Sequence, residues 1–156
     1  MTRAEFVKKY GGIYEHSPWV AEAVHGTQIS IDALHPAMQK VVDAADEGRK
    51  IALLRAHPDL ACAPADMTKL TASSQSEQAG AGLKECTPEE FAEFQKLNTD
   101  YKKKFGFPFI IAVTGLTRRD ILEAFRKRIN NSKPAEFETA LAQVHKIALI
   151  RLKKIA

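Results

Sequence analysis

Apolar residues recur at helical spacing along nearly the whole chain, and the alternation typical of strands is almost absent. The pattern predicts an all-α fold, an irregular bundle of about six to eight helices joined by short connections. The expected helices cover residues 3–9, 19–24, 36–47, 50–56, 71–83, 88–104, 117–129 and 132 to near the end. Residues 107–113 form the one run that looks extended.

Capping signals support several of these boundaries. Thr87-Pro88-Glu89-Glu90 is a capping box with proline in the first turn, and Thr117 pairs with Asp120 in the same way. Ser17 before Pro18 also reads as an N-cap. The helix that precedes His57 should end there, because a residue before proline is pushed out of the α region.

The length of 156 residues suits one hydrophobic core, so we expect residues 1–156 to form a single domain. No apolar run approaches the ~20 residues that span a bilayer. The N-terminus lacks a secretory pattern and the C-terminus lacks the peroxisomal one. The expected compartment is the cytoplasm, with no membrane association.

The net charge of +4 and the pI of about 9.1 raise the question of nucleic acid. The basic residues are spread over the helices rather than gathered in a block, so we expect no nucleic-acid partner. A mildly positive field also favours a small anionic substrate. The two cysteines, Cys62 and Cys86, lack metal-ligand spacing, and we expect thiols and no metal site.

Three places carry candidate chemistry. His57, at a predicted helix end before Pro58, can act as an acid, a base or a partner of an anion, or can simply satisfy the last carbonyls of its helix. Ser74-x-x-Glu77 fits a capping box, and the same geometry could present N–H groups, Glu77 and Gln78 to a ureido ligand. The backbone of residues 107–113, if outside a sheet, needs partners that a planar, amide-like ligand could provide.

The terminal helix carries a fourth. Phe137, Leu141, Val144, Ala148 and Ile155 share one face, and Arg151 falls within the same stripe. A buried arginine is costly unless it is paired with an anion. Two partners remain open: an internal carboxylate, or a substrate carboxylate bound in bidentate geometry.

The residues of these segments and the order of the segments resemble the 2-oxo-4-hydroxy-4-carboxy-5-ureidoimidazoline (OHCU) decarboxylase family. The resemblance spans residues 6–152 and rests on five segments, which are Tyr10-Gly11-Gly12-Ile13-Tyr14-Glu15-His16-Ser17-Pro18-Trp19-Val20, His57-Pro58-Asp59-Leu60-Ala61, Ser74-x-x-Glu77-Gln78-x-x-Ala81-Gly82-Leu83, Lys104-Phe105-Gly106-Phe107-Pro108-Phe109-Ile110 and Lys146-Ile147-Ala148-x-x-Arg151-Leu152.

The resemblance implies a cofactor-free carboxy-lyase that converts OHCU to (S)-allantoin in urate catabolism, without a metal and commonly as a homodimer. By matching motif position, His57, Glu77 and Arg151 would be the catalytic residues. The substrate-binding set would comprise Pro58, Ser74, Gln75, Ser76, Glu77, Gln78, Phe109, Ile110, Ile111, Ala112 and Val113. Two alternatives stay open: a non-catalytic helical binding module, and another enzyme that processes ureides.

Overall fold

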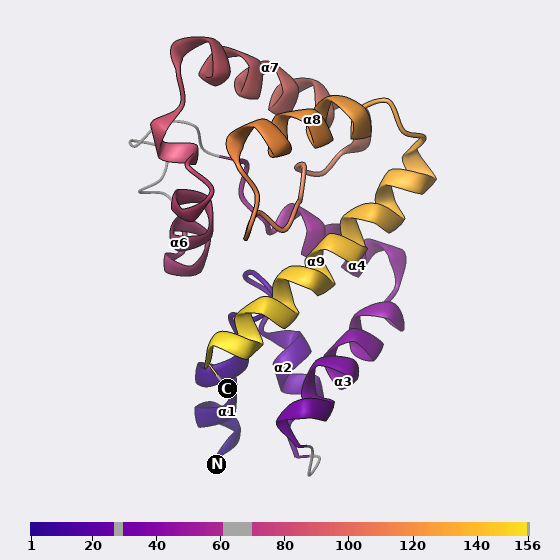
Figure 1. The fold of residues 1–156 in the computed structure, drawn as a ribbon. Coiled ribbons are helices and arrows are strands. Elements are labelled where there is room, and N and C mark those ends of the chain that lie inside the picture. Colours follow the sequence, from indigo (N-terminus) through magenta and orange to yellow (C-terminus); the bar gives the residue numbers. More distant parts are fainter. Residues whose placement is uncertain (27–29, 61–69, 156) are drawn as a thin grey trace. The chain divides into compact units, whose positions relative to one another are not determined.

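The computed structural model describes residues 1–26, 30–60 and 70–155. Within these residues every regular element is a helix and none is a strand, which confirms the predicted all-α class (Figure 1). The elements are α1 (Arg3–Tyr10), α2 (Trp19–Val24), α3 (Ile31–Asp43), α4 (Glu47–Arg55), α6 (Ala72–Gly80), the 3-10 helix η1 (Leu83–Glu85), α7 (Pro88–Phe105), α8 (Arg118–Arg128) and α9 (Lys133–Ile155).

The chain divides into two compact units. The first comprises Met1–His57 and Ala142–Ala156, and the second comprises Pro58–Leu141. Helix α9 therefore begins in the second unit and ends in the first. The expectation of a single domain over residues 1–156 stays a prediction, and each unit is described by itself.

In the first unit, α2 packs against both α1 and α3. Its core includes Val20, Met38, Val42 and Leu54, all of which are almost fully buried. The C-terminal part of α9 adds Val144, Ala148 and Leu152 to the buried set. The predicted stripe of α9 is thus confirmed in this unit, except that Ile155 at the helix end is 41% exposed.

In the second unit, α7 and α8 lie side by side (Figure 1). An aromatic cluster fills the space beneath them: Tyr101 meets Phe109 edge-on at 5.4 Å, and Phe109 stacks on Phe125 at 3.9 Å between ring centroids. Phe107 lies in a bend and residues 108–113 have no regular structure, so the run that looks extended in the sequence belongs to no sheet. Gly106 ends α7 with a φ of 80°, a left-handed conformation that favours glycine.

Capping predictions succeed in some places and fail in others. The boxes at Thr87 and Thr117 are confirmed. The cap at Ser17 is wrong, since its hydroxyl donates to the carbonyl of Glu15 instead. The cap at Ser74 is also wrong, because Thr71 caps α6 and accepts from the backbone N–H of Ser74.

The covalent structure differs from the sequence-based expectation at Cys86. Cys86 is disulfide-bonded, so the expectation of a thiol is wrong there; Cys62 lies outside the described residues.

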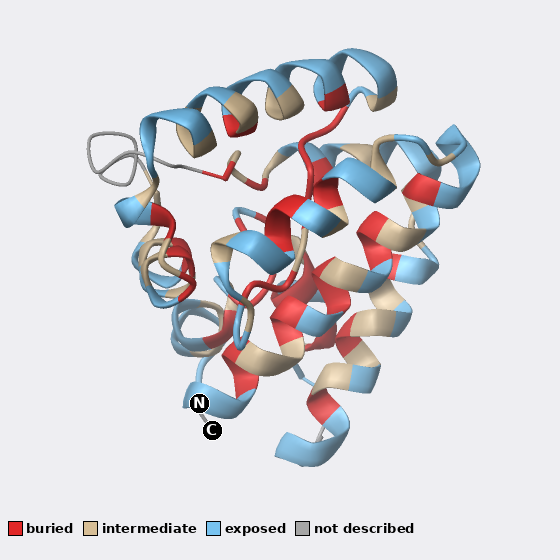
Figure 2. Cartoon of the chain, turned by 45° about the horizontal axis from the view of Figure 1, so that its top comes forward, coloured by how far each residue is buried: buried red, intermediate tan, exposed pale blue. Residues whose placement is uncertain are grey.

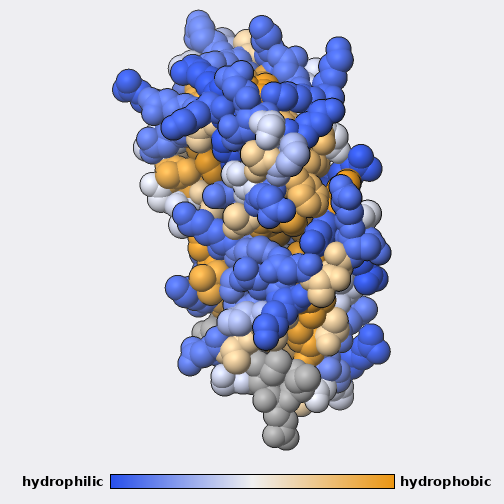
Figure 3. All heavy atoms as spheres, turned by 90° about the vertical axis from the view of Figure 1, so that its right-hand side faces the viewer, coloured by the Kyte–Doolittle hydropathy of each residue, from blue (hydrophilic) through white to orange (hydrophobic). Residues whose placement is uncertain are grey.

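Within each unit, helices expose one side and bury the other (Figure 2). Hydrophilic side chains dominate the face seen in Figure 3, with apolar ones in scattered patches. No described helix is long and apolar enough to cross a membrane.

Candidate active site

His57 lies just past the end of α4, where its backbone N–H bonds the carbonyl of Leu54 at 3.2 Å. The residue is only 8% exposed, and its Nε2 has no hydrogen-bond partner among the described residues. Burial lowers the pKa of His57 to about 4; the Glu15 carboxylate opposes this shift, while Arg151 and His16 add to it. The imidazole is therefore neutral at pH 7 and able to accept a proton.

Arg151 lies in the first unit with His57 and is 5% exposed. Its Nη1 is 2.7 Å from Oε2 of Glu15, whose side chain is 1% exposed, and it also donates to the carbonyl of Gly12 at 3.3 Å. The internal carboxylate, one of the two predicted alternatives, is therefore present. A contact with a substrate carboxylate stays a prediction.

Glu15 is a site residue that the sequence did not single out. It follows the N-terminal helix in a segment without regular structure, and only the burial of Arg151 signals that some anion must lie nearby. Its carboxylate and the Arg151 guanidinium both act on the pKa of His57. These three buried side chains, a neutral imidazole and a paired guanidinium and carboxylate, form the candidate catalytic cluster of the first unit.

A second buried network lies in the same unit. The Tyr14 hydroxyl is 2.8 Å from Nδ1 of His145, and Nε2 of His145 is 3.1 Å from Oδ1 of Asp43. His35 donates through Nε2 to the backbone carbonyl of His145 at 2.9 Å. These residues could not be connected from the sequence, because Tyr14, helix α3 with His35 and Asp43, and His145 lie far apart along the chain. The network ties Tyr14, the neighbour of Glu15, to α9.

The Ser74–Gln78 segment belongs to the second unit and forms the body of α6, not its cap. Ser74 and Gln78 are buried, Gln75 and Glu77 are half-buried, and Ser76 is exposed. Gln78 Nε2 donates to the carbonyl of Asp59 at 3.4 Å, and Gln75 Nε2 donates to the carbonyl of Leu70 at 3.4 Å. The segment beginning with Pro58, itself half-buried, is thus held to α6.

The extended segment Phe109–Val113 is also in the second unit and is anchored by Arg128. This guanidinium donates to the carbonyl of Ile110 at 2.7 Å and lies 4.4 Å from the ring centroid of Phe109. Its Nε donates to Glu136, which is fully buried and also accepts from Tyr101 at 2.8 Å. Ile111 is half-buried, while Ala112 and Val113 are 5% exposed.

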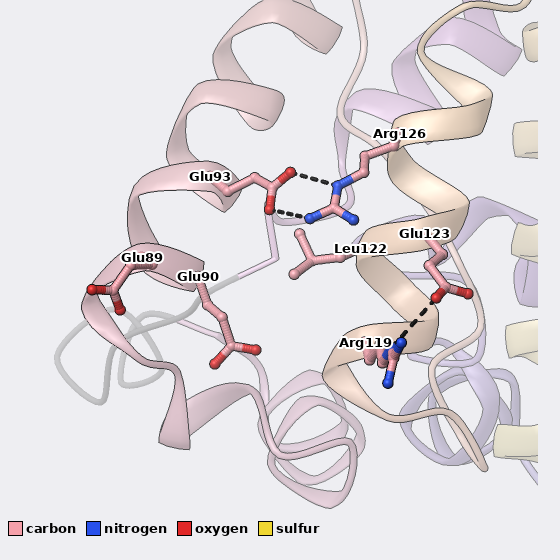
Figure 4. Close-up of a pocket in the computed structure, with 7 residues that line it drawn as sticks. All are labelled: Glu89, Glu90, Glu93, Arg119, Leu122, Glu123 and Arg126. Carbon is pink, nitrogen blue, oxygen red and sulfur yellow. Dashed lines mark hydrogen bonds and ion pairs between the residues drawn. The ribbon is translucent and has the colours of Figure 1, made fainter.

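The second unit also has a surface groove of about 380 Å³ between α7 and α8 (Figure 4). Its charges are largely paired with one another: Glu93 binds Arg126 through two oxygens, and Arg119 is 3.5 Å from Glu123. None of the predicted site residues lines it. In the described ranges, no group of three or more His, Cys, Asp or Glu side chains could hold a metal ion.

A neutral buried imidazole beside a buried arginine and carboxylate, in an all-α fold, is typical of an enzyme that moves protons on a polar, anionic substrate. The family model described as OHCU decarboxylase matches residues 1–153. The chain belongs to the OHCU decarboxylase family, a family of carboxy-lyases.

Individual relatives agree with this membership. The chain is 42% identical to the 2-oxo-4-hydroxy-4-carboxy-5-ureidoimidazoline decarboxylase of Haloferax volcanii, over 94% of this chain and 86% of that protein. It is 43% identical to the enzyme of the same name from Halalkalicoccus jeotgali, over 98% of this chain and 86% of that protein. A crystal structure of (S)-allantoin synthase superposes with a TM-score of 0.77 at 35% identity, over 99% of this chain and 51% of that one.

Proposed function

We propose that this protein catalyses the decarboxylation of OHCU to (S)-allantoin, in the breakdown of urate. The observation that carries the proposal is the match of the whole chain to relatives named for this reaction, together with a neutral His57 beside Arg151. The product follows from the solved (S)-allantoin synthase, to which the chain is similar. The substrate is thus a small ureide, and its carboxylate is an anion that the Arg151 guanidinium can bind.

The reaction needs no external electron sink. The carbon that bears the carboxylate also bears a hydroxyl and is bonded to an imine carbon. When the C–CO₂ bond breaks, CO₂ leaves, and the electron pair of that bond forms a C=C bond to the imine carbon. The C=N electron pair moves to the nitrogen, which takes up a proton. The enol so formed then becomes a ketone, as the hydroxyl gives up its proton and the former imine carbon takes one up. One proton is consumed overall, and the face that receives it fixes the handedness of allantoin.

We assign roles to three residues of the chain. His57, neutral and with an unpartnered Nε2, accepts the hydroxyl proton as the ketone forms. Arg151 binds the carboxylate before it leaves. Glu77 on α6 orients the ureido N–H groups as their acceptor. None of these roles uses a metal or an organic cofactor.

The rest of the substrate cradle consists of the residues predicted from the sequence. We propose that Pro58, the segment Ser74–Gln78 and the backbone of Phe109–Val113 bind the planar ureide ring. The anchoring of the Ile110 carbonyl by Arg128 supports this role, because a fixed backbone presents its polar groups in a defined direction. In this proposal residues 1–156 act as one catalytic domain.

Time-resolved circular dichroism tests the proposal. Urate oxidase and 5-hydroxyisourate hydrolase generate OHCU in situ, with the protein added or withheld. We expect the protein to accelerate the appearance of (S)-allantoin well beyond spontaneous decay, which gives racemic product. An optical signal that the protein leaves unchanged would refute the decarboxylase function and favour another ureide or a binding role.

A matched pair of histidine variants localises the chemistry. His57→Asn should lower kcat by about 100-fold or more, the typical contribution of a general base. His25→Asn, in a half-buried histidine elsewhere in the first unit, should leave turnover unchanged. Full activity and stereoselectivity in His57→Asn would remove His57 from the mechanism.

We also propose that the protein is a cytoplasmic homodimer, as the family resemblance implies. Light scattering coupled to gel filtration would give twice the mass of the 17.3 kDa chain. A monomer that is fully active would contradict the dimer and leave the catalytic proposal in place.

A further inference from the structure

The Glu15 carboxylate is paired with Arg151, the cation that the proposed reaction assigns to the substrate carboxylate. We propose that Glu15 is a positioning residue that shares Arg151 with the substrate carboxylate and so keeps the substrate's ion pair weak. This inference rests on the proposed function, in which Arg151 meets that carboxylate.

The geometry makes the Glu15–Arg151 contact a strong one. Oε2 of Glu15 is 2.7 Å from Nη1 of Arg151, and the two side chains are 1% and 6% exposed. Charges so well shielded from water interact far more strongly than a surface pair, because little solvent screens them. A substrate carboxylate that approaches Arg151 therefore meets a cation already largely neutralised.

Glu15 is held in place by contacts that do not involve Arg151. Its backbone carbonyl accepts the Ser17 hydroxyl at 3.1 Å. The preceding residue, Tyr14, is bound through its hydroxyl to His145 on α9. These contacts hold the backbone at Glu15, from which its carboxylate reaches Arg151.

The Glu15–Arg151 ion pair matters for decarboxylation because it limits how tightly the substrate carboxylate is bound before CO₂ leaves. The negative charge of the substrate carboxylate disappears as neutral CO₂ forms, so an ion pair with it is stronger in the ground state than in the transition state. An interaction of that kind lowers KM but raises the barrier of the chemical step. By neutralising Arg151 in advance, Glu15 leaves enough attraction to orient the carboxylate and limits the stabilisation of the ground state.

The decisive variant is Glu15→Gln, which removes the charge and keeps the shape and an oxygen that can accept from Arg151. Calorimetry would compare two probes: allantoate, a ureide with a carboxylate, and (S)-allantoin, which has none. We expect allantoate to bind about tenfold more tightly, the effect of a modest charge–charge interaction, and (S)-allantoin to bind as before. In turnover, KM and kcat should both fall.

Weaker or unchanged binding of allantoate would overturn the proposal, and so would equal changes for the two probes or a raised KM with unchanged kcat. Glu15→Asp guards against misfolding, because Arg151 keeps a charged partner at slightly longer reach. In that variant the gain for allantoate should be smaller than in Glu15→Gln but still present. An affinity at or below that of the original protein would count against the proposal.

Glu93→Gln is the matched control. It removes an equivalent charge from the Glu93–Arg126 pair on the surface groove, and the ratio of the two dissociation constants should not change (Figure 4). The binding ratio does not depend on turnover. A protein that binds both probes but yields no (S)-allantoin would thus refute the proposed function while the role of Glu15 is still tested.

Discussion

At the scale of single residues, His57 shows how burial keeps an imidazole in its neutral form, which can accept a proton. Water is largely excluded from the imidazole, and the charged form loses more from this exclusion than the neutral form does. Glu15 moderates the effect, since its negative charge favours the imidazolium. The residue is therefore neutral through the physiological range, and its Nε2 has a lone pair or proton to offer a ligand.

Histidine titration by NMR would test this electrostatic account. We expect the His57 imidazole to titrate near pH 4, compared with 6.5 for an unperturbed histidine. Glu15→Gln should lower the pKa further, because the opposing charge is removed, whereas Glu93→Gln should not affect it. A His57 that titrates near 6.5 in the folded protein would show that burial does not control its charge.

His145 is the second histidine whose surroundings fix its state. The Asp43 carboxylate can only accept, so Nε2 of His145 donates to it and Nδ1 accepts the Tyr14 proton. Burial lowers the pKa of His145, against the influence of Asp43, which is consistent with this neutral form. The bond from Tyr14 thus satisfies a ring nitrogen that would otherwise be buried without a partner.

Tyr14→Phe should lower the free energy of unfolding by about 1–3 kcal/mol, the cost of leaving a buried acceptor unsatisfied. Tyr10→Phe is the matched control: Tyr10 is similarly buried, at 5% exposed, but among the described residues its side chain makes ring contacts and no hydrogen bond. Urea unfolding would measure both. Equal losses in the two variants would mean that the bond to His145 contributes nothing.

Residues differ in how far the sequence reveals their roles. Arg151 was predictable, because its place in an apolar stripe demands an anion. The identity of that anion was not, since Glu15 lies 136 positions earlier, a separation that periodicity cannot bridge. The roles of His145 and His35 could not be predicted for the same reason. Tyr14 and Asp43, the partners of His145, and the His145 carbonyl, the partner of His35, come together only through the tertiary fold.

At the scale of elements, the extended segment 107–113 depends on its neighbours for stability. It pairs with no strand in the part of the chain that the structure describes, so its carbonyls must find partners elsewhere. Arg128 supplies one through its bond to Ile110, and Glu136 at the start of α9 holds the guanidinium in turn. One arginine fork thus joins α8, α9 and the segment proposed to bind substrate.

Arg128→Lys should separate this geometry from charge alone. Lysine keeps the positive charge but cannot bind Glu136 and the Ile110 carbonyl with one planar group. We expect a loss of about 2 kcal/mol in unfolding free energy and a severalfold higher KM, from a less ordered substrate segment. Arg126→Lys, in the more exposed pair with Glu93, should leave the unfolding free energy nearly unchanged, because solvent screens that pair. Similar effects in both would contradict the anchoring role.

Helix boundaries were predictable where the signal is local. Thr87 and Thr117 cap their helices because the hydroxyl and the reciprocal acid lie three residues apart. Ser74 failed as a cap because Thr71, three residues earlier, had already begun the helix. Helix α3 begins at Ile31 and not at Pro36, and the bond of His35 to α9 supports the turn before the proline.

At the scale of the whole molecule, buried titratable groups set the pH range of stability. Below pH 6.5 an unfolded His57 takes up a proton that the folded protein rejects until about pH 4, so stability falls as pH drops through this range. Burial raises the pKa of Tyr14 and of Tyr101 above the usual 10, so stability falls again as pH rises beyond that value.

Urea midpoints measured from pH 4 to pH 11 should therefore pass through a plateau near neutrality. The acid arm should account for about 3 kcal/mol between pH 6.5 and 4 if His57 dominates it, and His57→Asn should flatten that arm. Tyr14→Phe should reduce the alkaline arm, to which Tyr101 still contributes, and should leave the acid arm unchanged. An acid arm that is the same in His57→Asn would assign the loss to other groups.

The two contacts between residues 14–15 and α9 carry a consequence for how the sequence can change over time. Tyr14 binds His145 and Glu15 binds Arg151. Two adjacent residues of the N-terminal segment therefore bind two residues of α9 that are six positions apart. An insertion of one residue between His145 and Arg151 would rotate Arg151 by about 100° around the helix axis while Tyr14 kept its partner. Substitutions here can be gradual, but a change of length cannot, and selection should keep this stretch of α9 free of gaps.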